Sequence, residues 1–225
     1  KLRMNASQIM RVAQTLYENG HITYMRTDSI NLSSEALNAS RKVIEKKYGK
    51  EYLPSSPRVY KNKVKNAQEA HEAIRPAGAT FKDPNELQSV LSDQEYKVYD
   101  LIWKRTVASQ MNSAQIEQTK LQISDGDYIF IANGKTIIFP GFLRSYVEGS
   151  DDPNADLDDM EKTLPKVTLG DSVKWDKILS KQHFTKPISR FTEASLVKEL
   201  ELLGIGRPST YATIMKKIQD KGYVD

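Results

Sequence analysis

The sequence predicts an α+β fold with more than one domain. Apolar residues recur at helical spacing through the first half of the chain, and from about Gln115 the spacing changes to the period of two that is typical of strands. Helical spacing returns near Thr192, and no internal repeat is present. Because helical and strand-like segments are segregated along the chain, we expect a helical domain at 1–112, a β-rich domain at 113–182 and a helical segment at 183–225.

The first two helices are each marked by a capping signal. Asn5, with a glutamine three residues later, forms a capping-box pattern before an apolar stripe that ends at Gly20. Ser33 is expected to begin a second helix, which Gly49 ends. The segment 21–32 between them is too polar for a core and too short for a domain.

Two further helices are expected before residue 112. Asp83, followed by Pro84, predicts a short helix, and Ser92 with Glu95 repeats the capping-box pattern ahead of a longer one. Aromatic side chains of the longer helix lie at helical spacing, and we expect them in the core: Tyr96, Tyr99 and Trp103.

Strands are expected in the middle of the chain. Segments 115–124 and 127–139 carry the alternating pattern, and Asn133-Gly134 lies between two apolar runs, which predicts a hairpin turn at that dipeptide. Shorter strands are expected at 167–169 and 173–178, separated by a turn at Gly170, with Trp175 packed in the second.

The chain ends with two expected helices. Thr192 caps a helix with Leu196, Val197, Leu200 and Leu203 facing inward. A tight turn at 204–209 then leads into a helix at 210–221.

Composition favours a globular, intracellular protein with a polyanionic partner. Of 225 residues, 39% are hydrophobic, which is enough for a core, and no apolar run could span a bilayer. The net charge of +4 includes seven acids and no Lys or Arg between Glu148 and Glu161, so the remainder is strongly basic. We expect that acidic segment to be a flexible loop. Surface solubility explains many such charge balances equally well.

The residue inventory also excludes several kinds of site. The absence of Cys rules out disulfides and Cys-ligated zinc, and the three His are too scattered to suggest a metal cage. The first residue is Lys1, and no hydrophobic signal segment follows it, so we expect a piece of a longer chain.

Tyr24 and Arg26 form the first candidate site. A phenol is only weakly acidic, so a tyrosine needs help to act as a nucleophile. Arg26 lies two residues away, and its guanidinium could clamp a phosphate and stabilise developing charge. Thr27, Asp28 and Ser29 could orient Arg26 or hold a turn. By spacing alone this is a weak signal, because most tyrosines are packed or surface aromatics.

Three ordered motifs make the signal specific. Residues 16–29 read LYENGHITYMRTDS, residues 70–76 read AHEAIRP, and the last motif is FTEASL at 191–196 followed by GIGRPSTYA at 204–212. Together they resemble the type IA DNA topoisomerases of bacteria, in the same order and over most of the chain. One departure is Ala77, where the family often carries a hydroxyl residue.

The resemblance implies a mechanism and a set of site residues. Tyr24 would attack a single-stranded DNA phosphodiester, forming a 5′-phosphotyrosyl link, and reversal after strand passage would relax negative supercoils without ATP. Arg26 would hold the scissile phosphate. The resemblance and helix-terminus chemistry together suggest further DNA contacts at His71, Arg75, Thr192, Ser195 and Arg207. Alternatively, Glu72 and Arg75 form only a local ion pair, and Thr192 and Ser195 only a helix cap.

The resemblance also implies what the chain lacks. In this family Mg²⁺ is bound by a Toprim domain that precedes the segment seen here, and a zinc-ribbon tail is also missing. The domain at 1–112 would carry the active-site tyrosine, 113–182 would belong to an arch or hinge, and 183–225 would begin the DNA-binding groove. Because partner strands of the arch would come from before Lys1, the β part would be incomplete and its strand edges exposed. We expect a monomeric, cytoplasmic, nucleoid-associated protein. The 225-residue chain alone should bind single-stranded DNA weakly, with strong salt dependence, and should not relax supercoiled DNA.

Three rival classes remain open on the residues alone. One is a non-catalytic, winged-helix-like DNA-binding module in which Tyr24 is structural, although no basic recognition face is evident at 210–219. A tyrosine recombinase would place its tyrosine late in the chain, whereas Tyr24 comes early. The third is a purely structural interaction domain. Covalent capture of a labelled single-stranded oligonucleotide, lost on Tyr24→Phe, would distinguish the topoisomerase interpretation from all three.

Overall fold

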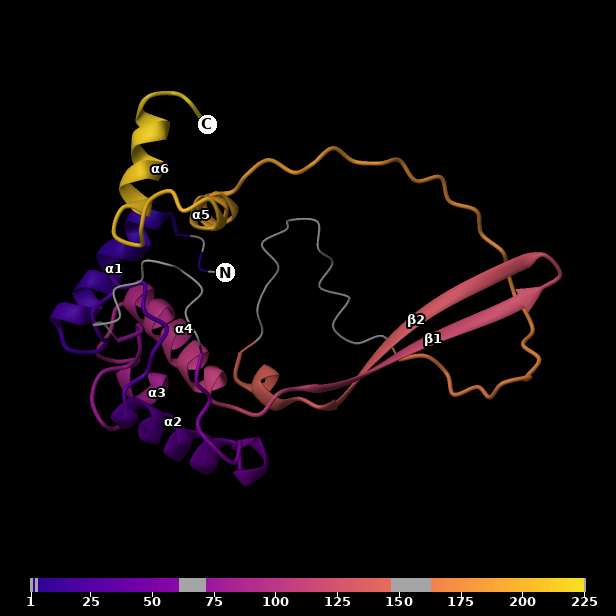
Figure 1. Ribbon diagram of the computed structural model, residues 1–225, viewed down its shortest axis with the longest axis horizontal. Helices are drawn as coiled ribbons and strands as arrows, with labels where there is room; N and C mark the ends of the chain where they lie inside the picture. The colour runs from indigo at the N-terminus through magenta and orange to yellow at the C-terminus, as the bar shows by residue number, and fades with distance from the viewer. Residues whose placement is uncertain (1, 3, 61–71, 147–162, 225) are drawn as a thin grey trace.

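The computed structural model describes residues 2, 4–60, 72–146 and 163–224. It combines a helical body, one long β-hairpin and an extended segment that returns to a pair of C-terminal helices (Figure 1). The expected mixture of helix and sheet is therefore confirmed. Within the described ranges, no helix is long and apolar enough to cross a membrane. The acidic segment at 148–161, predicted to be a flexible loop, lies outside these ranges.

The helical body is built from the four expected helices. They are α1 (Ala6–Glu18), α2 (Ser34–Lys47), the short α3 (Pro84–Leu87) and α4 (Asp93–Ser109), with a 3₁₀ turn at Lys50–Tyr52. The side chains of Asn5, Ser33, Asp83 and Ser92 all accept hydrogen bonds from the first helical turn, so the four predicted caps are confirmed. The caps work locally because each satisfies a backbone N–H that has no partner within its own helix.

The core lies where α1 and α2 pack against α4. Leu16, Ile44 and Val107 are fully buried there, and the large rings of Tyr99 and Trp103 fill the space between the helices. Tyr99 and Trp103 are thus core residues as expected, whereas Tyr96 is only partly buried. The Tyr99 hydroxyl donates to the Lys82 carbonyl, and burial raises the pKa of Tyr99.

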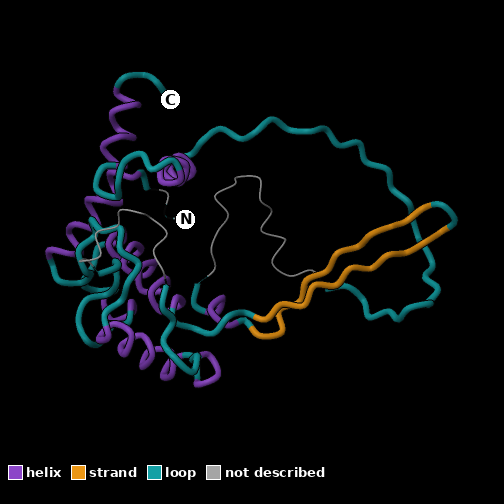
Figure 2. The backbone as a smooth tube through the Cα atoms, in the orientation of Figure 1, coloured by secondary structure: helices purple, strands orange, loops and turns teal. Residues whose placement is uncertain are grey.

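The hairpin is formed by β1 (Gln115–Asp125) and β2 (Tyr128–Phe139), which pair antiparallel (Figure 2). The prediction of a turn at Asn133-Gly134 is wrong: Gly134 pairs with Thr119 in mid-strand, and the turn lies at Gly126, where φ is +57°. A turn at 133–134 would leave two strands of about four residues. The turn at Gly126 instead allows a long continuous ladder, and glycine adopts its positive φ without steric cost.

The strands predicted at 167–169 and 173–178 are also wrong. Residues 163–192, which we call the return segment, run as extended chain without a strand partner among the described residues (Figure 2). A strand requires hydrogen bonds from a neighbour, and alternation in the sequence does not supply one. The predicted turn is present, because Asp171 N donates to Thr168 O and Gly170 has a φ of +92°. Trp175 is not packed: 76% of it is exposed.

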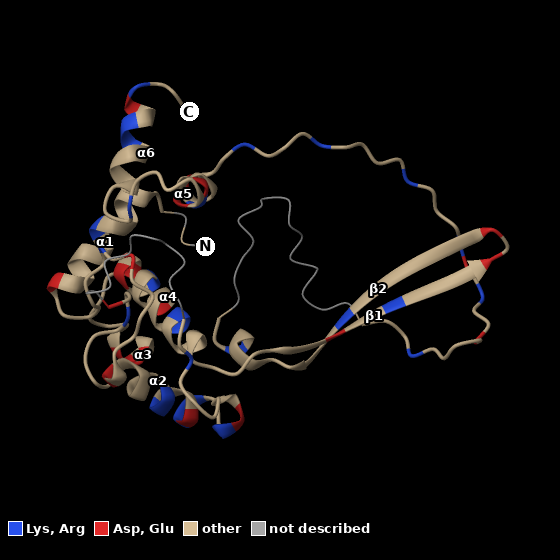
Figure 3. Cartoon of the chain, viewed as in Figure 1, with Lys and Arg blue, Asp and Glu red and all other residues tan. Residues whose placement is uncertain are grey.

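The C-terminal helices are α5 (Glu193–Leu202) and α6 (Tyr211–Asp220), close to the expected bounds. The pair lies beside α1 (Figure 1), where Met215 of α6 is buried. The inward face predicted for α5 forms only in part: Leu196, Val197 and Leu200 are half-buried, whereas Leu203 is exposed. Lys and Arg are spaced along the return segment that leads into α5 (Figure 3).

Candidate active site around Tyr24 and Arg26

Tyr24 lies on the tyrosine loop, defined here as residues 21–33, which connects α1 to α2. The loop leaves α1 through a Schellman motif. Gly20 N donates to Tyr17 O, and His21 N donates to Leu16 O. Gly20 has a φ of +71°, which glycine adopts most readily. The direction in which the chain leaves α1 is therefore fixed by hydrogen bonds to the last turn of the helix.

The start of the tyrosine loop is bound to a segment some fifty residues further along the chain. Thr23 N donates to Arg75 O at 2.9 Å, and Arg75 N donates to Thr23 Oγ1 at 2.9 Å. The same hydroxyl donates to Ala73 O at 2.8 Å, and Ile22 forms an isolated antiparallel bridge with Pro76. Thr23, which directly precedes Tyr24, is thus held in place through both its backbone and its side chain.

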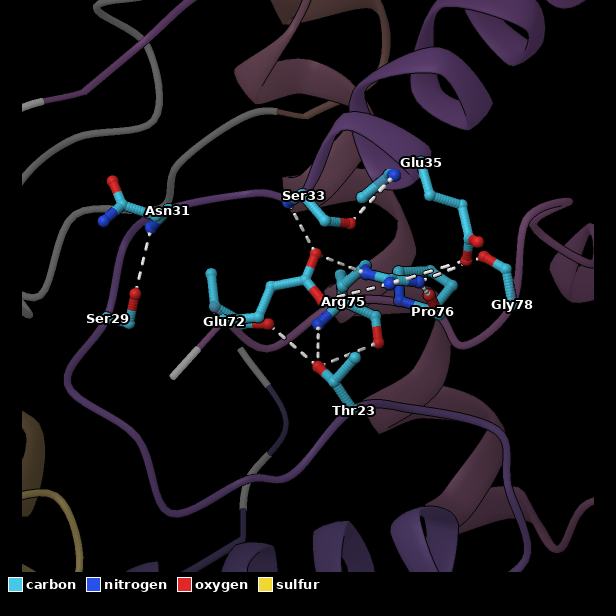
Figure 4. A network of polar contacts seen from close by, with 11 residues as sticks. Thr23, Ser29, Asn31, Ser33, Glu35, Glu72, Arg75, Pro76 and Gly78 are labelled. Carbon is cyan, nitrogen blue, oxygen red and sulfur yellow. Dashed lines mark hydrogen bonds and ion pairs between the residues drawn. The ribbon is translucent and has the colours of Figure 1, made fainter. Parts of the chain in front are cut away.

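The far end of the loop is bound to the same segment (Figure 4). Ala73 N donates to Asn31 O at 2.8 Å, and Ser33 N donates to the Glu72 carboxylate at 2.8 Å. Residues 72–77, here called the clamp segment, therefore hold both ends of the loop. The motif at 16–29 and residues 72–76 of the second motif, which are separate in the sequence, meet in one structural unit.

Glu72 and Arg75 form a two-pronged ion pair at the centre of the clamp segment (Figure 4). Arg75 Nε and an Nη donate to the two Glu72 oxygens at 2.8 and 3.0 Å, and the other Nη donates to the carbonyls of Pro76 and Gly78. Burial alone would raise the pKa of Glu72, but the hydrogen bonds from Arg75 and Ser33 outweigh it and hold the pKa below its ordinary value.

The burial of Arg75 bears on its expected role as a DNA contact. Its side chain is only 8% exposed, and its guanidinium donates to one carboxylate and two carbonyls. A phosphate could reach it only by displacing these partners. The geometry therefore favours the local ion-pair alternative, in which Arg75 supports the loop from within. His71, expected beside it, lies outside the described residues.

Tyr24 and Arg26 are presented on the outer side of the clamped loop. Both side chains are exposed. Ile22, two residues before Tyr24, and Met25, between Tyr24 and Arg26, are buried in the core and anchor the backbone. The Tyr24 ring makes an edge-to-face contact with Tyr17 of α1, with ring centroids 5.1 Å apart. A nucleophile and a cation are thus accessible on a backbone that is held from behind.

Arg207 is brought to the loop from the other end of the chain. Its guanidinium donates to the Asp28 carboxylate at 3.2 Å, and its backbone N–H donates to Thr210 Oγ1. Asp28 therefore does more than hold a turn, the alternative considered for 27–29. The turn itself is held by Thr27 and Ser29, whose hydroxyls accept the backbone N–H groups two residues on.

Thr192 and Ser195 form the N-terminal cap of α5. Thr192 Oγ1 accepts from Ser195 N, and Ser195 Oγ accepts from Thr192 N. Glu193 beside them accepts a hydrogen bond from Ala6 N at 2.7 Å, which ties α5 to the start of α1. These two residues are therefore held near α1 by the cap and its neighbour, and both remain accessible.

The described part of the chain offers no group of three His, Cys, Asp or Glu that could hold a metal ion. Near Tyr24, the carboxylates of Glu72 and Asp28 are each paired with an arginine. The described residues therefore do not fit a magnesium site of their own.

Sequence reasoning missed two residues that shape the site. Thr23 was read only as part of a motif, although its position next to Tyr24 and its hydroxyl could have indicated a clamp. Tyr17 lies in the last turn of α1, seven positions ahead of Tyr24, and nothing in that spacing predicts a ring contact.

Comparison with known proteins identifies the family. A family model described as DNA topoisomerase matches residues 1–225. DNA topoisomerase 1 of Streptomyces coelicolor is 56% identical over 100% of this chain and 24% of the relative, and that of Synechococcus elongatus is 55% identical over 99% and 25%. The chain thus spans about a quarter of the length of these curated relatives.

A solved structure agrees with the sequence comparisons. Full-length topoisomerase I from Thermotoga maritima superposes with a TM-score of 0.77 at 35% identity, covering 100% of this chain and 36% of that one. Since the family model and the relatives cover the whole sequence, the chain belongs to the DNA topoisomerase family, among the bacterial type IA topoisomerases I.

Proposed function

We propose that this chain supplies the tyrosine half of a topoisomerase active site that cleaves and rejoins single-stranded DNA. The observation that carries the proposal is the exposed pair Tyr24 and Arg26 on a loop whose two ends are bound to one distant segment. Family membership supports the same role. A rigid backbone with exposed reactive groups suits catalysis, because the reacting atoms must be held in a fixed geometry.

The proposed reaction exchanges one phosphodiester for another. Tyr24 Oη gives up its proton and attacks the scissile phosphorus, the bond from phosphorus to the 3′ oxygen breaks, and that oxygen takes up a proton and leaves as a 3′-hydroxyl, so one proton is lost and one is gained. The protein is then joined to the 5′ phosphate, and the reverse attack restores the strand after another strand has passed. No ATP is needed, because the phosphotyrosyl bond retains the energy of the bond that was broken.

Each residue of the site has a proposed role. Arg26 binds the scissile phosphate and stabilises the charge that develops on its oxygens. Arg207, 47% exposed in its side chain, and the α5 start with Thr192 and Ser195 contact neighbouring phosphates. His71 contacts a phosphate or assists proton movement. Arg75 is proposed as support for the loop in place of its expected DNA contact.

The rest of the function rests on the longer protein. We propose that Mg²⁺, which would neutralise phosphate charge, is held by a domain outside this chain, since the described residues do not fit it. Residues 1–112 form the tyrosine-bearing domain, 113–182 part of an arch or hinge, and 183–225 the start of a DNA groove. The protein would act as a monomer on negatively supercoiled DNA in the cytoplasm, and this chain alone would be inactive in relaxation.

Covalent capture tests the proposal. The full-length protein is mixed with a 3′-end-labelled single-stranded oligonucleotide and denatured, and a labelled protein band reports the 5′-phosphotyrosyl adduct. Tyr24→Phe should abolish the band, because it removes the attacking oxygen, while Tyr128→Phe on the exposed hairpin should leave it unchanged. Undiminished adduct in Tyr24→Phe would refute Tyr24 as the nucleophile. Oligonucleotide binding without any adduct in the parent protein would favour the winged-helix-like alternative.

A further inference from the structure

The contacts of the clamp segment fix the backbone around Tyr24 but not its ring. Thr23 and Met25 are held on either side, yet 41% of Tyr24 is exposed, and its Cα–Cβ bond can rotate between staggered positions. An attacking oxygen at the tip of a phenol moves by several ångströms when that bond rotates. Productive attack therefore needs something that selects one orientation of the ring.

Tyr17 is placed to make that selection. It lies in the last turn of α1, and its ring meets the Tyr24 ring edge to face, with centroids 5.1 Å apart and planes inclined at 64°. This is the arrangement that the quadrupoles of two aromatic rings favour.

The Tyr17 ring is itself attached to a rigid support. The capping box of Asn5 closes one end of α1, and the Schellman motif through Gly20 and His21 closes the other. Leu16, the neighbour of Tyr17, is fully buried in the core. A contact with Tyr17 thus ties the orientation of the Tyr24 ring to the helical body.

We propose that Tyr17 is a positioning residue whose ring holds the Tyr24 phenol in the orientation from which it attacks the phosphodiester. The inference rests on the proposed role of Tyr24 as nucleophile and adds a second aromatic residue to that site. The ring of Tyr17 carries the effect and its hydroxyl does not, because the contact is between ring faces and edges.

A different use of Tyr17 is as a stacking platform for a DNA base, since it is also 41% exposed. The two uses differ in what they change. Positioning alters the rate of covalent attack once DNA is bound, whereas stacking alters the affinity for DNA.

The experiment compares Tyr17→Leu and Tyr17→Phe in the full-length protein. The rate of adduct formation is measured in a single turnover at saturating single-stranded oligonucleotide, and the dissociation constant is measured separately by anisotropy in a Tyr24→Phe background. Tyr17→Leu should slow adduct formation by about two- to tenfold, the range expected for one lost aromatic pair. Its dissociation constant should stay within about twofold of the parent's, and Tyr17→Phe should restore the rate.

Tyr128→Leu is the matched control, because Tyr128 is an exposed tyrosine on the hairpin, 73% accessible. It should change neither quantity. If Tyr17→Leu does not fold, Tyr17→Gln replaces it, since the neighbouring surface of α1 already carries Gln14 and Glu18. A fluorine label on the Tyr24 ring gives a second measurement: its resonance should shift in the Leu or Gln variant and return in Tyr17→Phe.

Three results would overturn the inference. They are an unchanged rate in Tyr17→Leu, a rate in Tyr17→Phe as low as in Tyr17→Leu, and a loss explained entirely by a weaker dissociation constant, which would assign base stacking to Tyr17. Failure of the proposed function looks different, because adduct would then persist in Tyr24→Phe.

Discussion

The tyrosine loop is held by hydrogen bonds to the clamp segment, 39 to 56 positions away in the chain, whereas the β1–β2 hairpin is held by hydrogen bonds between its own two neighbouring strands. Both regions are exposed. In the loop, exposure is confined to a few side chains in front of buried contacts. In the hairpin, apolar residues such as Ile129 and Ile131 are exposed along most of the ladder.

The two regions therefore differ in what fixes them to the body. The hairpin is anchored at its base, where the tilted rings of Tyr52 and Phe139 are in contact, with centroids 4.9 Å apart, and Phe142 N donates to Asn112 O. Beyond this base, the two strands pair with each other along the ladder. The loop is anchored at both ends by the clamp segment, and the buried side chains of Ile22 and Met25 anchor it to the core as well. The comparison indicates that the region with proposed chemistry is the one held by non-local contacts.

The largest expected effect comes from breaking the Glu72–Arg75 pair. Glu72→Ala removes both hydrogen bonds between Glu72 and the buried Arg75 guanidinium, leaving Glu35 at 3.9 Å as its remaining carboxylate among the described residues, and it removes the acceptor of Ser33 N. Removing one partner of a buried ion pair costs about 3 kcal/mol of unfolding free energy. Chemical denaturation should show this loss, and the yield of covalent adduct should fall with it, because the Ser33 end of the tyrosine loop loses an anchor and Arg75, which holds the Thr23 end, loses its main partner.

Lys50→Ala is the control, because it removes an ion pair with Glu45 at the surface, and it should cost under about 0.5 kcal/mol. The pH dependence of the unfolding free energy provides a second test of the Glu72–Arg75 pair. Since the pKa of Glu72 is lower in the folded protein, its charged form stabilises the fold above the unfolded value, and that contribution disappears as pH falls below about 4. Glu72→Gln should remove this part of the acid sensitivity. Equal acid sensitivity in Glu72→Gln and the parent would contradict the proposed coupling.

The second largest effect is expected at the base of the hairpin, where a substitution should destabilise the helical body more than one at the hairpin turn. Gly141 has a φ of +50°, and a Cβ placed there would lie 2.5 Å from Asn112 O, so Gly141→Ala should cost about 2 kcal/mol or more in the denaturation of the body. Gly126 also has a positive φ, but nothing lies within 4 Å of its added Cβ. Gly126→Ala should leave the midpoint of the body unchanged and accelerate amide exchange in β1 and β2. Equal effects of the two variants on the body would show that the hairpin is more tightly coupled to it than its contacts indicate.

The smallest effect concerns the contact between the loop and the C-terminal helices. Asp28 and Arg207 form a partly exposed ion pair, so Arg207→Ala should lower the unfolding free energy by under about 1 kcal/mol, and less in high salt. Binding of single-stranded DNA should weaken as well, with the salt slope reduced by about one if Arg207 contacts a phosphate. An unchanged salt slope would remove Arg207 from the proposed DNA contacts while leaving its ion pair intact.

Sequence determined those features that depend on neighbouring residues. The caps at Asn5, Ser33, Ser92 and Thr192 were all predictable, because a capping side chain bonds to a backbone N–H two or three residues away. The three ordered motifs at 16–29, 70–76 and 191–212 also identified the family, since the identity and order of residues can be read without knowledge of their contacts.

Only the tertiary structure decided which distant residues meet. Residues 115–139 contain two plausible glycine turns, and the choice of Gly126 over Gly134 depended on the length of ladder that each allows. Whether Arg75 faced DNA or Glu72, and whether Tyr17 touched Tyr24, depended on how the clamp segment and α1 pack against the tyrosine loop. Sequence spacing carries no information on such contacts, because long-range hydrogen bonds and ring contacts are set by the packing of the whole body.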